Sequence, residues 1–230
     1  QPEPIQVLVA GATGALGNEV VRRLIGSQQF TTVTVLAREP IRAAMRGVAA
    51  WPVPTDCPAG WPAARATLGV ILFEPPRMFY ERERALWTPV PQQLADTAAW
   101  MRRSGVGTLA VVLPHEQGRL PEALKRGLAG LDEHQVAALG FERVLFIRSA
   151  RKPRAAGSQG LMHGLASAML AIFRYMVPHS EQPVRAVKVA ELLALALELA
   201  PPGIHVAAPE QVWRAAQGPM RAEALAWLQR

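Results

Sequence analysis

The N-terminal stretch 5–27 constrains the fold of this chain more than any other part of the sequence. An apolar run, IQVLVA, leads into three glycines spaced three residues apart, and an amphipathic stretch, NEVVRRLIGS, follows them. The apolar run has the character of a buried strand, and the apolar residues after the glycines recur at helical spacing. The sequence therefore predicts a strand, a glycine turn and a helix in immediate succession.

The glycines of this turn each have a physical task. Gly11 lets the backbone turn sharply, Gly14 leaves no side chain between the backbone and a phosphate, and Gly17 lets helix and strand pack closely. A pyrophosphate can then lie against the exposed amides and the positive end of the helix. The context on both sides favours dinucleotide binding over a turn that merely joins two elements. The residues predicted to bind the cofactor here are Gly11, Thr13, Gly14, Ala15, Leu16 and Gly17.

The spacing G-x-x-G-x-x-G, with Ala12 and Thr13 between the first two glycines, resembles that of the short-chain dehydrogenase/reductase superfamily. GATGALG is similar to the motif of its extended and atypical members, the NAD(P)-dependent epimerase/dehydratase-like and NmrA-like proteins. The order of elements continues the resemblance over most of the chain. It implies an α/β fold of Rossmann type, a doubly wound, mostly parallel sheet with helices on both faces, and a dinucleotide cofactor.

Strand and helix patterns alternate along the rest of the chain. Apolar and β-branched runs predict strands at 31–37, 48–53, 68–73, 108–113, 143–148 and 204–207. Helical spacing predicts helices at 91–104, 120–139, 190–200 and 220–228. This alternation is typical of a doubly wound parallel sheet. We expect a single domain over residues 1–230, with a small substrate-side region from about residue 149 onward.

Arg38 directly follows the second expected strand and bears on the choice of cofactor. In folds of this kind an acidic residue there binds the free 2′-hydroxyl of the adenosine ribose, whereas an arginine neutralises a 2′-phosphate. Arg38 therefore favours NADP, although a solvated arginine at a helix start fits the same pattern, and the neighbouring Glu39 keeps NAD open as the alternative. The resemblance also implies that Asp56, after the third strand, lies at the adenine edge.

The loop after the fourth expected strand departs from the resembled proteins, which commonly place small residues there. This sequence has Glu74, Pro75, Pro76 and Arg77. The prolines remove two backbone donors, and Glu74 puts a carboxylate where an anionic cofactor should pass. Either this loop stands away from the cofactor or cofactor binding is impaired.

The catalytic residues of the resembled superfamily are missing from their expected positions. In that superfamily a tyrosine exchanges a proton, a lysine four residues later lowers its pKa, and a serine orients the substrate. The tyrosine and lysine positions fall on Lys125 and Ala129, and Leu113, Pro114 and His115 replace the serine region. Whether the chain is an enzyme stays open at this point.

Two residues are candidates for a relocated proton donor, and two for a substrate contact. His115 follows the fifth strand, where ligands bind in open α/β sheets, although an exposed loop histidine fits the same pattern. Tyr80 has Arg84 four residues later as a cation that would lower its pKa, although a surface aromatic fits as well. Arg148 and Arg151 fit an acidic or phosphorylated substrate or, alternatively, a solvated loop.

Two classes of function follow from these observations. The first is an NADP(H)-binding, short-chain dehydrogenase-like protein without the Tyr/Lys machinery, which acts as a redox-sensing or scaffold protein. The second is an NAD(P)H-dependent reductase of a small substrate with relocated catalytic groups. The replaced Tyr and Lys positions and the unusual loop favour the first class. Beyond the dinucleotide, the partner is a small molecule or a protein that the sequence does not identify.

Charge and composition narrow the partners and the compartment. The net charge of +7 rests almost entirely on arginines scattered over the whole chain, so nucleic acid is not a favoured partner. Cys57 is the only cysteine, and the five histidines fall in separate segments, so we predict no metal site and no intrachain disulfide. The long apolar stretches carry charged residues and predict buried helices. We therefore expect a cytoplasmic protein with no membrane partner.

Overall fold

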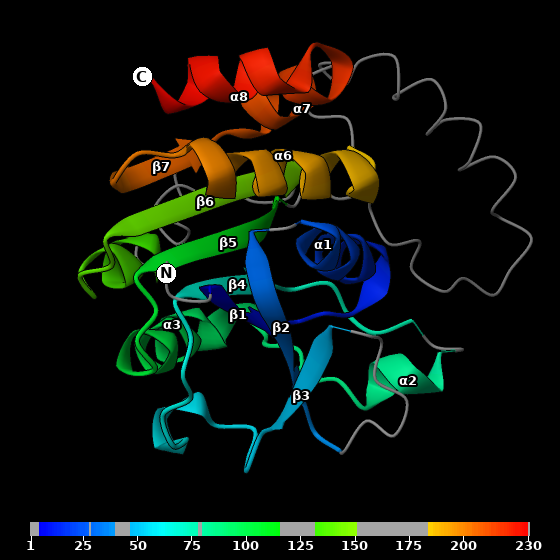
Figure 1. The fold of residues 1–230 in the computed structure, drawn as a ribbon, viewed down its shortest axis with the longest axis vertical. Helices are drawn as coiled ribbons and strands as arrows, with labels where there is room; N and C mark the ends of the chain where they lie inside the picture. Colours follow the sequence, from blue (N-terminus) through cyan, green and yellow to red (C-terminus); the bar gives the residue numbers. More distant parts are fainter. Residues whose placement is uncertain are drawn as a thin grey trace, which may run out of the picture.

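Seven parallel strands form one sheet in the described part of the chain (Figure 1). The computed structural model describes residues 5–27, 29–39, 47–77, 80–115, 132–150 and 184–229. The sheet order is β3-β2-β1-β4-β5-β6-β7. The strands are β1 (Ile5–Ala10), β2 (Phe30–Ala37), β3 (Val48–Pro52), β4 (Leu68–Leu72), β5 (Thr108–His115), β6 (Arg143–Ala150) and β7 (Gly203–Ala207). The predicted α/β fold with a doubly wound parallel sheet is confirmed.

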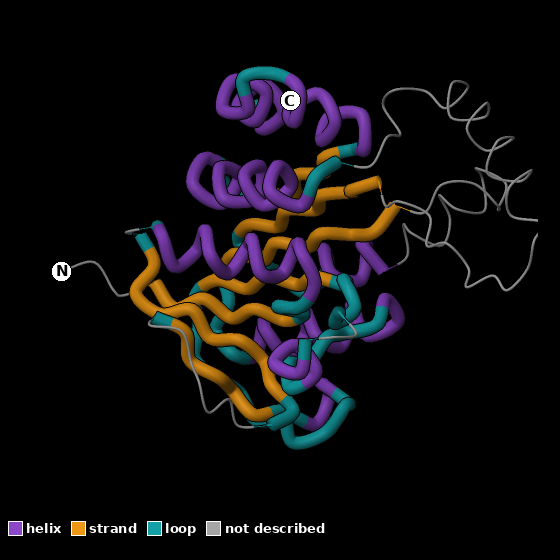
Figure 2. The backbone as a smooth tube through the Cα atoms, turned by 90° about the vertical axis from the view of Figure 1, so that its right-hand side faces the viewer, coloured by secondary structure: helices purple, strands orange, loops and turns teal. Residues whose placement is uncertain are grey.

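Helices cover both faces of this sheet (Figure 2). On one face lie α1 (Gly14–Gly26) and α6 (Ala186–Leu199), which pack against each other, and α7 (Pro209–Gln217) and α8 (Met220–Leu228), which pack against α6. The opposite face is covered by α3 (Leu94–Arg103), together with the helical residues 132–137. The remaining short helices are η1 (Pro58–Gly60), α2 (Glu81–Arg84) and η2 (Pro91–Gln93).

The alternation of side chains along β1 shows why this strand lies inside the fold. Val7 and Val9 belong to the core on the α1 and α6 face, whereas Leu8 and Ala10 belong to the core on the α3 face. All five residues of β4 are buried, which agrees with its central place between β1 and β5. The two central strands are therefore held from both faces, and the turn after β1 starts from a rigid position.

The connection between β3 and β4 is short and rich in proline, and it has no full helix. Instead it carries η1, and the indole of Trp61 packs into a cluster of four tryptophans. The ring centroid of Trp61 lies 4.8 Å from that of Trp87, 5.0 Å from that of Trp100 and 5.7 Å from that of Trp51. These aromatic side chains bury the apolar area that a crossover helix would otherwise cover.

The predicted elements differ from the observed ones mainly in their ends. Every described strand ends within two residues of its expected bounds, and β5 and β6 run on to His115 and Ala150. The expected helix at 91–104 opens as η2 before α3 begins, because Pro91 suits a first turn. The helix α7 was not predicted. Most of the helix expected at 120–139 lies outside the described residues, which resume at residue 132.

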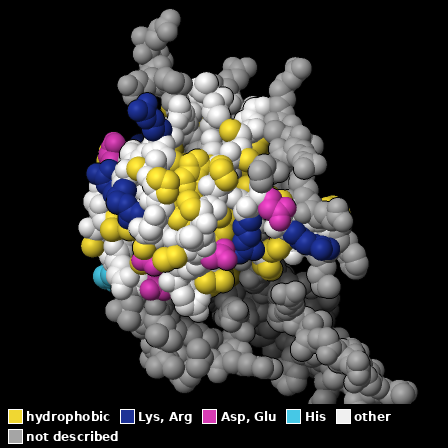
Figure 3. Space-filling view, turned by 90° about the horizontal axis from the view of Figure 1, so that it is seen from below, with side chains coloured by type: hydrophobic (Ala, Val, Ile, Leu, Met, Phe, Trp, Pro, Cys, Tyr) yellow, Lys and Arg dark blue, Asp and Glu magenta, His cyan; other side chains and the backbone are white. Residues whose placement is uncertain are grey.

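Charges of both signs are mixed on the face seen in Figure 3, where hydrophobic side chains gather between separate basic and acidic residues. Within the described ranges, no helix is both long and apolar enough to cross a membrane. Among the same residues, no group of three His, Cys, Asp or Glu side chains is placed to hold a metal ion.

Candidate functional site

The glycine turn lies at the carboxyl end of β1, where the order of the sheet reverses. The chain leaves β1 toward β2 on one side and reaches β4 on the other, which is the position where open α/β sheets bind ligands. Gly11 and Gly14 have φ angles of +80° and +71°, which side-chain-bearing residues rarely adopt. A β-carbon on Gly17 would lie 2.5 Å from the carbonyl carbon of Ala12. The conformational freedom and the close packing expected of these glycines are both present.

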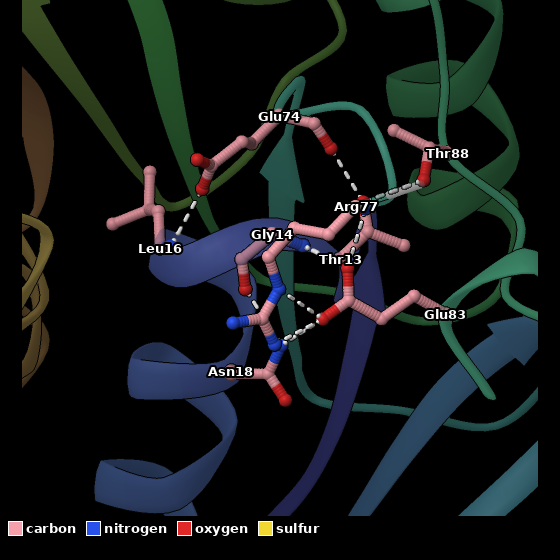
Figure 4. Close-up of polar contacts among 8 residues, drawn as sticks. All are labelled: Thr13, Gly14, Leu16, Asn18, Glu74, Arg77, Glu83 and Thr88. Atoms are coloured by element: carbon pink, nitrogen blue, oxygen red, sulfur yellow. Dashed lines mark hydrogen bonds and ion pairs between the residues drawn. The ribbon is translucent and has the colours of Figure 1, made fainter. Parts of the chain in front are cut away.

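The carboxylate of Glu74 lies directly on this turn (Figure 4). The amide of Leu16 donates a hydrogen bond of 2.6 Å to Glu74 Oε2. The hydroxyl of Thr13 donates to the backbone carbonyl of Glu74 and contacts the hydroxyl of Thr88 at 2.9 Å. A β-carbon on Gly14 would lie 2.4 Å from the carboxyl carbon of Glu74. The loop after β4 therefore lies against the turn, and whether cofactor binding is impaired stays a prediction.

A second carboxylate, that of Glu83 in α2, reaches the same turn and is almost fully buried, with 4% of the residue exposed. The amide of Gly14 donates to Glu83 Oε2 at 3.0 Å, and Asn18 Nδ2 donates to Oε1 at 2.8 Å. Arg77 closes the other side: its backbone amide and its Nε each donate to Glu83 at 2.8 Å. Glu83 thus joins the start of α1 to the loop after β4.

The residues after α2 then run across the carboxyl ends of β1 and β2. The Ala85 carbonyl accepts from the Arg38 amide at 2.7 Å, the Trp87 amide donates to the Leu36 carbonyl at 2.9 Å, and the Trp87 carbonyl accepts from the Gly11 amide at 3.1 Å. We call residues 74–88 the crossing segment; residues 78 and 79 within it lie outside the described ones. Three amides of the turn, those of Gly11, Gly14 and Leu16, donate to acceptors in this segment.

The electrostatic surroundings of Glu83 favour its charged form. Burial opposes ionisation, but hydrogen bonds from Arg77, the Gly14 amide and Asn18 outweigh it, and the pKa of Glu83 lies below its ordinary value. The same pairing raises the pKa of Arg77. Both groups are therefore charged at neutral pH, and two acceptor oxygens lie at the positive end of α1.

We expect the contribution of Glu83 to stability to depend on pH. Because its pKa is lowered by folding, the contribution is complete above the ordinary glutamate value of about 4.3 and is lost as the pH falls through the pKa of the folded state. The melting temperature of the wild type should exceed that of Glu83→Gln by a constant amount above about pH 6, and this difference should shrink below about pH 4. Thermal melts across this range measure it, and a difference that stays constant into acid would contradict the assignment.

A pyrophosphate does not fit the turn in the arrangement described. The amides that would hold it already donate to Glu74, Glu83 and Trp87, and the Glu74 carboxyl group fills the space above Gly14. A phosphate bound to these amides would also lie close to the two carboxylates, and their negative charges would repel it. The backbone of the turn has the form of an anion site, and the anions in it are side chains of this chain.

The residues predicted at the adenosine end form a pair with each other. Arg38 donates to Asp56 Oδ1 from Nη2 at 3.0 Å and from Nε at 3.2 Å, and both side chains are largely exposed. The indole nitrogen of Trp87 donates to the same oxygen at 3.2 Å. The structure brings Arg38 and Asp56 together at the end of β2; their roles toward a cofactor stay predictions.

The other predicted residues lie apart from one another. Tyr80 is half exposed, and the guanidinium carbon of Arg77 lies 3.9 Å from its ring centroid. His115 ends β5. Arg148 forms a double hydrogen bond to the buried carboxylate of Glu133, at 3.0 and 2.6 Å. The positions Arg151, Lys125 and Ala129 lie outside the described residues.

Sequence reasoning missed Glu83, Arg77 and Asn18 as parts of this site. Glu83 lies in the charged run ERER, where local pattern predicts solvated side chains. Only the pairing of the crossing segment with β2 turns it inward. Asn18 directly follows Gly17, and a polar side chain one turn after Gly14 in α1 was the one available signal.

No protein-family model and no curated protein matches this sequence. Solved structures do match its fold. A nucleoside-diphosphate-sugar epimerase from Staphylococcus aureus has a TM-score of 0.53 at 13% identity, over 89% of this chain and 71% of the epimerase. MoeE5 in complex with UDP-glucuronic acid and NAD has a TM-score of 0.51 at 16% identity, over 87% of this chain and 75% of MoeE5.

A triphenylmethane reductase from Citrobacter sp., complexed with NADP(H), has a TM-score of 0.53 at 17% identity, over 87% of this chain and 68% of the reductase. At such identities the likeness establishes the Rossmann-type fold shared with epimerases and reductases. A shared fold does not determine the ligand, so the function of this chain depends on the residues at its own site.

Proposed function

We propose that this chain is an NADP(H)-binding protein of short-chain dehydrogenase type that works without Tyr/Lys catalysis, as a redox-sensing or scaffold protein. One observation carries the proposal. At the switch point of the sheet, the amides of Gly14 and Leu16 hold carboxylate oxygens at 3.0 and 2.6 Å, so this turn is built to accept anionic oxygens. The fold neighbours complexed with NAD and NADP(H) support a dinucleotide as the anion.

The residues at the end of β2 support NADP over NAD. Arg38 is exposed, and its partner Asp56 is exposed as well, so the guanidinium can exchange this carboxylate for a 2′-phosphate at little cost. A buried arginine held by a buried acid would not make such an exchange. NAD remains the alternative cofactor.

A role in sensing or scaffolding follows from what surrounds the turn. The superfamily's Tyr and Lys positions fall on Lys125 and Ala129, and the crossing segment occupies the turn with two carboxylates. In such a protein, dinucleotide binding would change the state of the site. The arrangement therefore suits a sensor or scaffold better than it suits an enzyme that turns over substrate at each encounter.

The reductase alternative has one observation in its favour. Tyr80 is half exposed beside the site, and the guanidinium carbon of Arg77 lies 3.9 Å from the centroid of its ring. Stopped-flow oxidation of bound NADPH against quinones and small carbonyls tests this reading. Oxidation that Tyr80→Phe slows would favour the reductase, and no oxidation would favour the sensor or scaffold.

Calorimetric titration with NADPH and NADH tests the proposed function. We expect the wild type to bind NADPH, Gly14→Asp to abolish binding, and Arg38→Ala to weaken NADPH about tenfold while leaving NADH unchanged, since the 2′-phosphate is the only difference. Arg22→Ala is the matched control, because Arg22 is an exposed arginine paired with Glu19 on α1. Equal loss for both nucleotides in Arg38→Ala would contradict the NADP assignment.

A further inference from the structure

We propose that Glu74 and Glu83 form an internal substitute for the pyrophosphate, so that a dinucleotide and the acidic part of the crossing segment compete for the same amides. This inference rests on the proposed function for the identity of the competing ligand. Its physical basis is that two carboxylates of this chain occupy the turn. A turn that only joined a strand to a helix would not need them.

The two carboxylates take the place of a cap for α1. Thr13, at the N-cap position, makes no side-chain hydrogen bond to the helix; its hydroxyl turns to Glu74 and Thr88 instead. There is no acidic residue in the first turn of α1 itself. The Gly14 and Leu16 amides are satisfied from outside, by Glu83 and Glu74, which are two charged oxygens at the positive helix end.

The positive charge that balances Glu83 also belongs to the crossing segment. Arg77 binds Glu83 through its backbone amide and its side chain, and its guanidinium lies over Tyr80. When Glu83 leaves the turn for solvent, the exposed guanidinium of Arg77 can exchange that carboxylate for a phosphate. The exchange therefore replaces one ion pair by another and leaves no buried charge without a partner.

Polar contacts hold the acidic part of the crossing segment, whereas apolar packing holds its end at Trp87. Pro75, Pro76 and Arg77 are exposed, and the part of the crossing segment that contacts the turn is bound by polar contacts. By contrast, Leu86 and Trp87 are buried, and Trp87 packs against Trp61. Release of the acidic part, with the Trp87 end held in place, costs little apolar burial.

Titration of inorganic pyrophosphate and of NADPH into four proteins tests this competition: the wild type, Glu74→Ala, Glu74→Ala/Glu83→Ala, and the control Glu210→Ala, which removes an exposed carboxylate in the first turn of α7. We expect the double variant to bind both ligands about tenfold more tightly than the wild type or the control, as for a site freed from a closed state. Glu74→Ala alone keeps the Glu83–Arg77 pair, so its affinity for both ligands should rise by less. This single variant still tests the competition if the double variant does not fold.

The outcomes separate this inference from the proposed function. Tighter binding of pyrophosphate without any binding of NADPH would uphold the competition and overturn the dinucleotide function. Equal NADPH affinity in all four proteins would uphold the function and overturn the competition. Binding of neither ligand to the folded variants would overturn both.

Discussion

Replacing Glu83 by alanine is expected to destabilise the protein by about 2–4 kcal/mol, a loss of about 5–15 °C in melting temperature for a chain of this size. The side chain accepts hydrogen bonds within 3.0 Å from the Gly14 amide, from Asn18 and from three nitrogens of Arg77. Because this side chain is almost fully buried, its removal leaves a cavity, and the first amide of α1 beside it loses its partner.

Thermal and urea unfolding of Glu83→Ala, Glu83→Gln and the control Glu210→Ala measure this effect. The glutamine variant keeps the volume but loses the charge, so its loss should be intermediate, and the exposed control should change stability by less than about 0.5 kcal/mol. An alanine variant as stable as the control would mean that the crossing segment contributes nothing to the fold and that its contacts to the turn are incidental.

Replacing Gly17 by alanine is expected to destabilise the protein by about 3 kcal/mol or more, because the added methyl group has no space. Its β-carbon would lie 2.5 Å from the carbonyl carbon of Ala12 and 2.8 Å from the carbonyl oxygen of Gly11, and both are backbone atoms that no rotamer change can move. To accept the methyl group, α1 must move away from the turn, which weakens its packing on Val7 and Val9.

Gly26 in the same helix is the matched control. Neither Gly17 nor Gly26 has a positive φ, and a β-carbon on Gly26 would meet nothing within 4 Å. Gly26→Ala should therefore be neutral or stabilise by about 0.5 kcal/mol, through reduced freedom of the unfolded chain. If both variants shift the unfolding midpoint equally, the close approach of helix and turn would not be the reason for glycine at position 17.

The Glu74 loop shows how far sequence reasoning reached into the site. Glu74 follows a buried strand, and the topology of the fold puts the end of that strand beside the glycine turn, so a conflict with an anionic ligand was visible from the residues alone. Glu83 was not visible in this way. It stands nine positions further on in a charged run, and only the pairing of Trp87 with Leu36 and Gly11 brings it back to Gly14.

The sequence alone determined the elements whose causes are local: a buried strand, a turn that requires glycine, an amphipathic helix, and their alternation into a parallel sheet. Those features follow from side-chain periodicity and from backbone conformations that few residues adopt. Only the tertiary structure decided what lies in the turn. A charged side chain such as that of Glu83 is equally stable in water, so its burial depends on partners far along the chain, such as Gly14, and no local pattern predicts it.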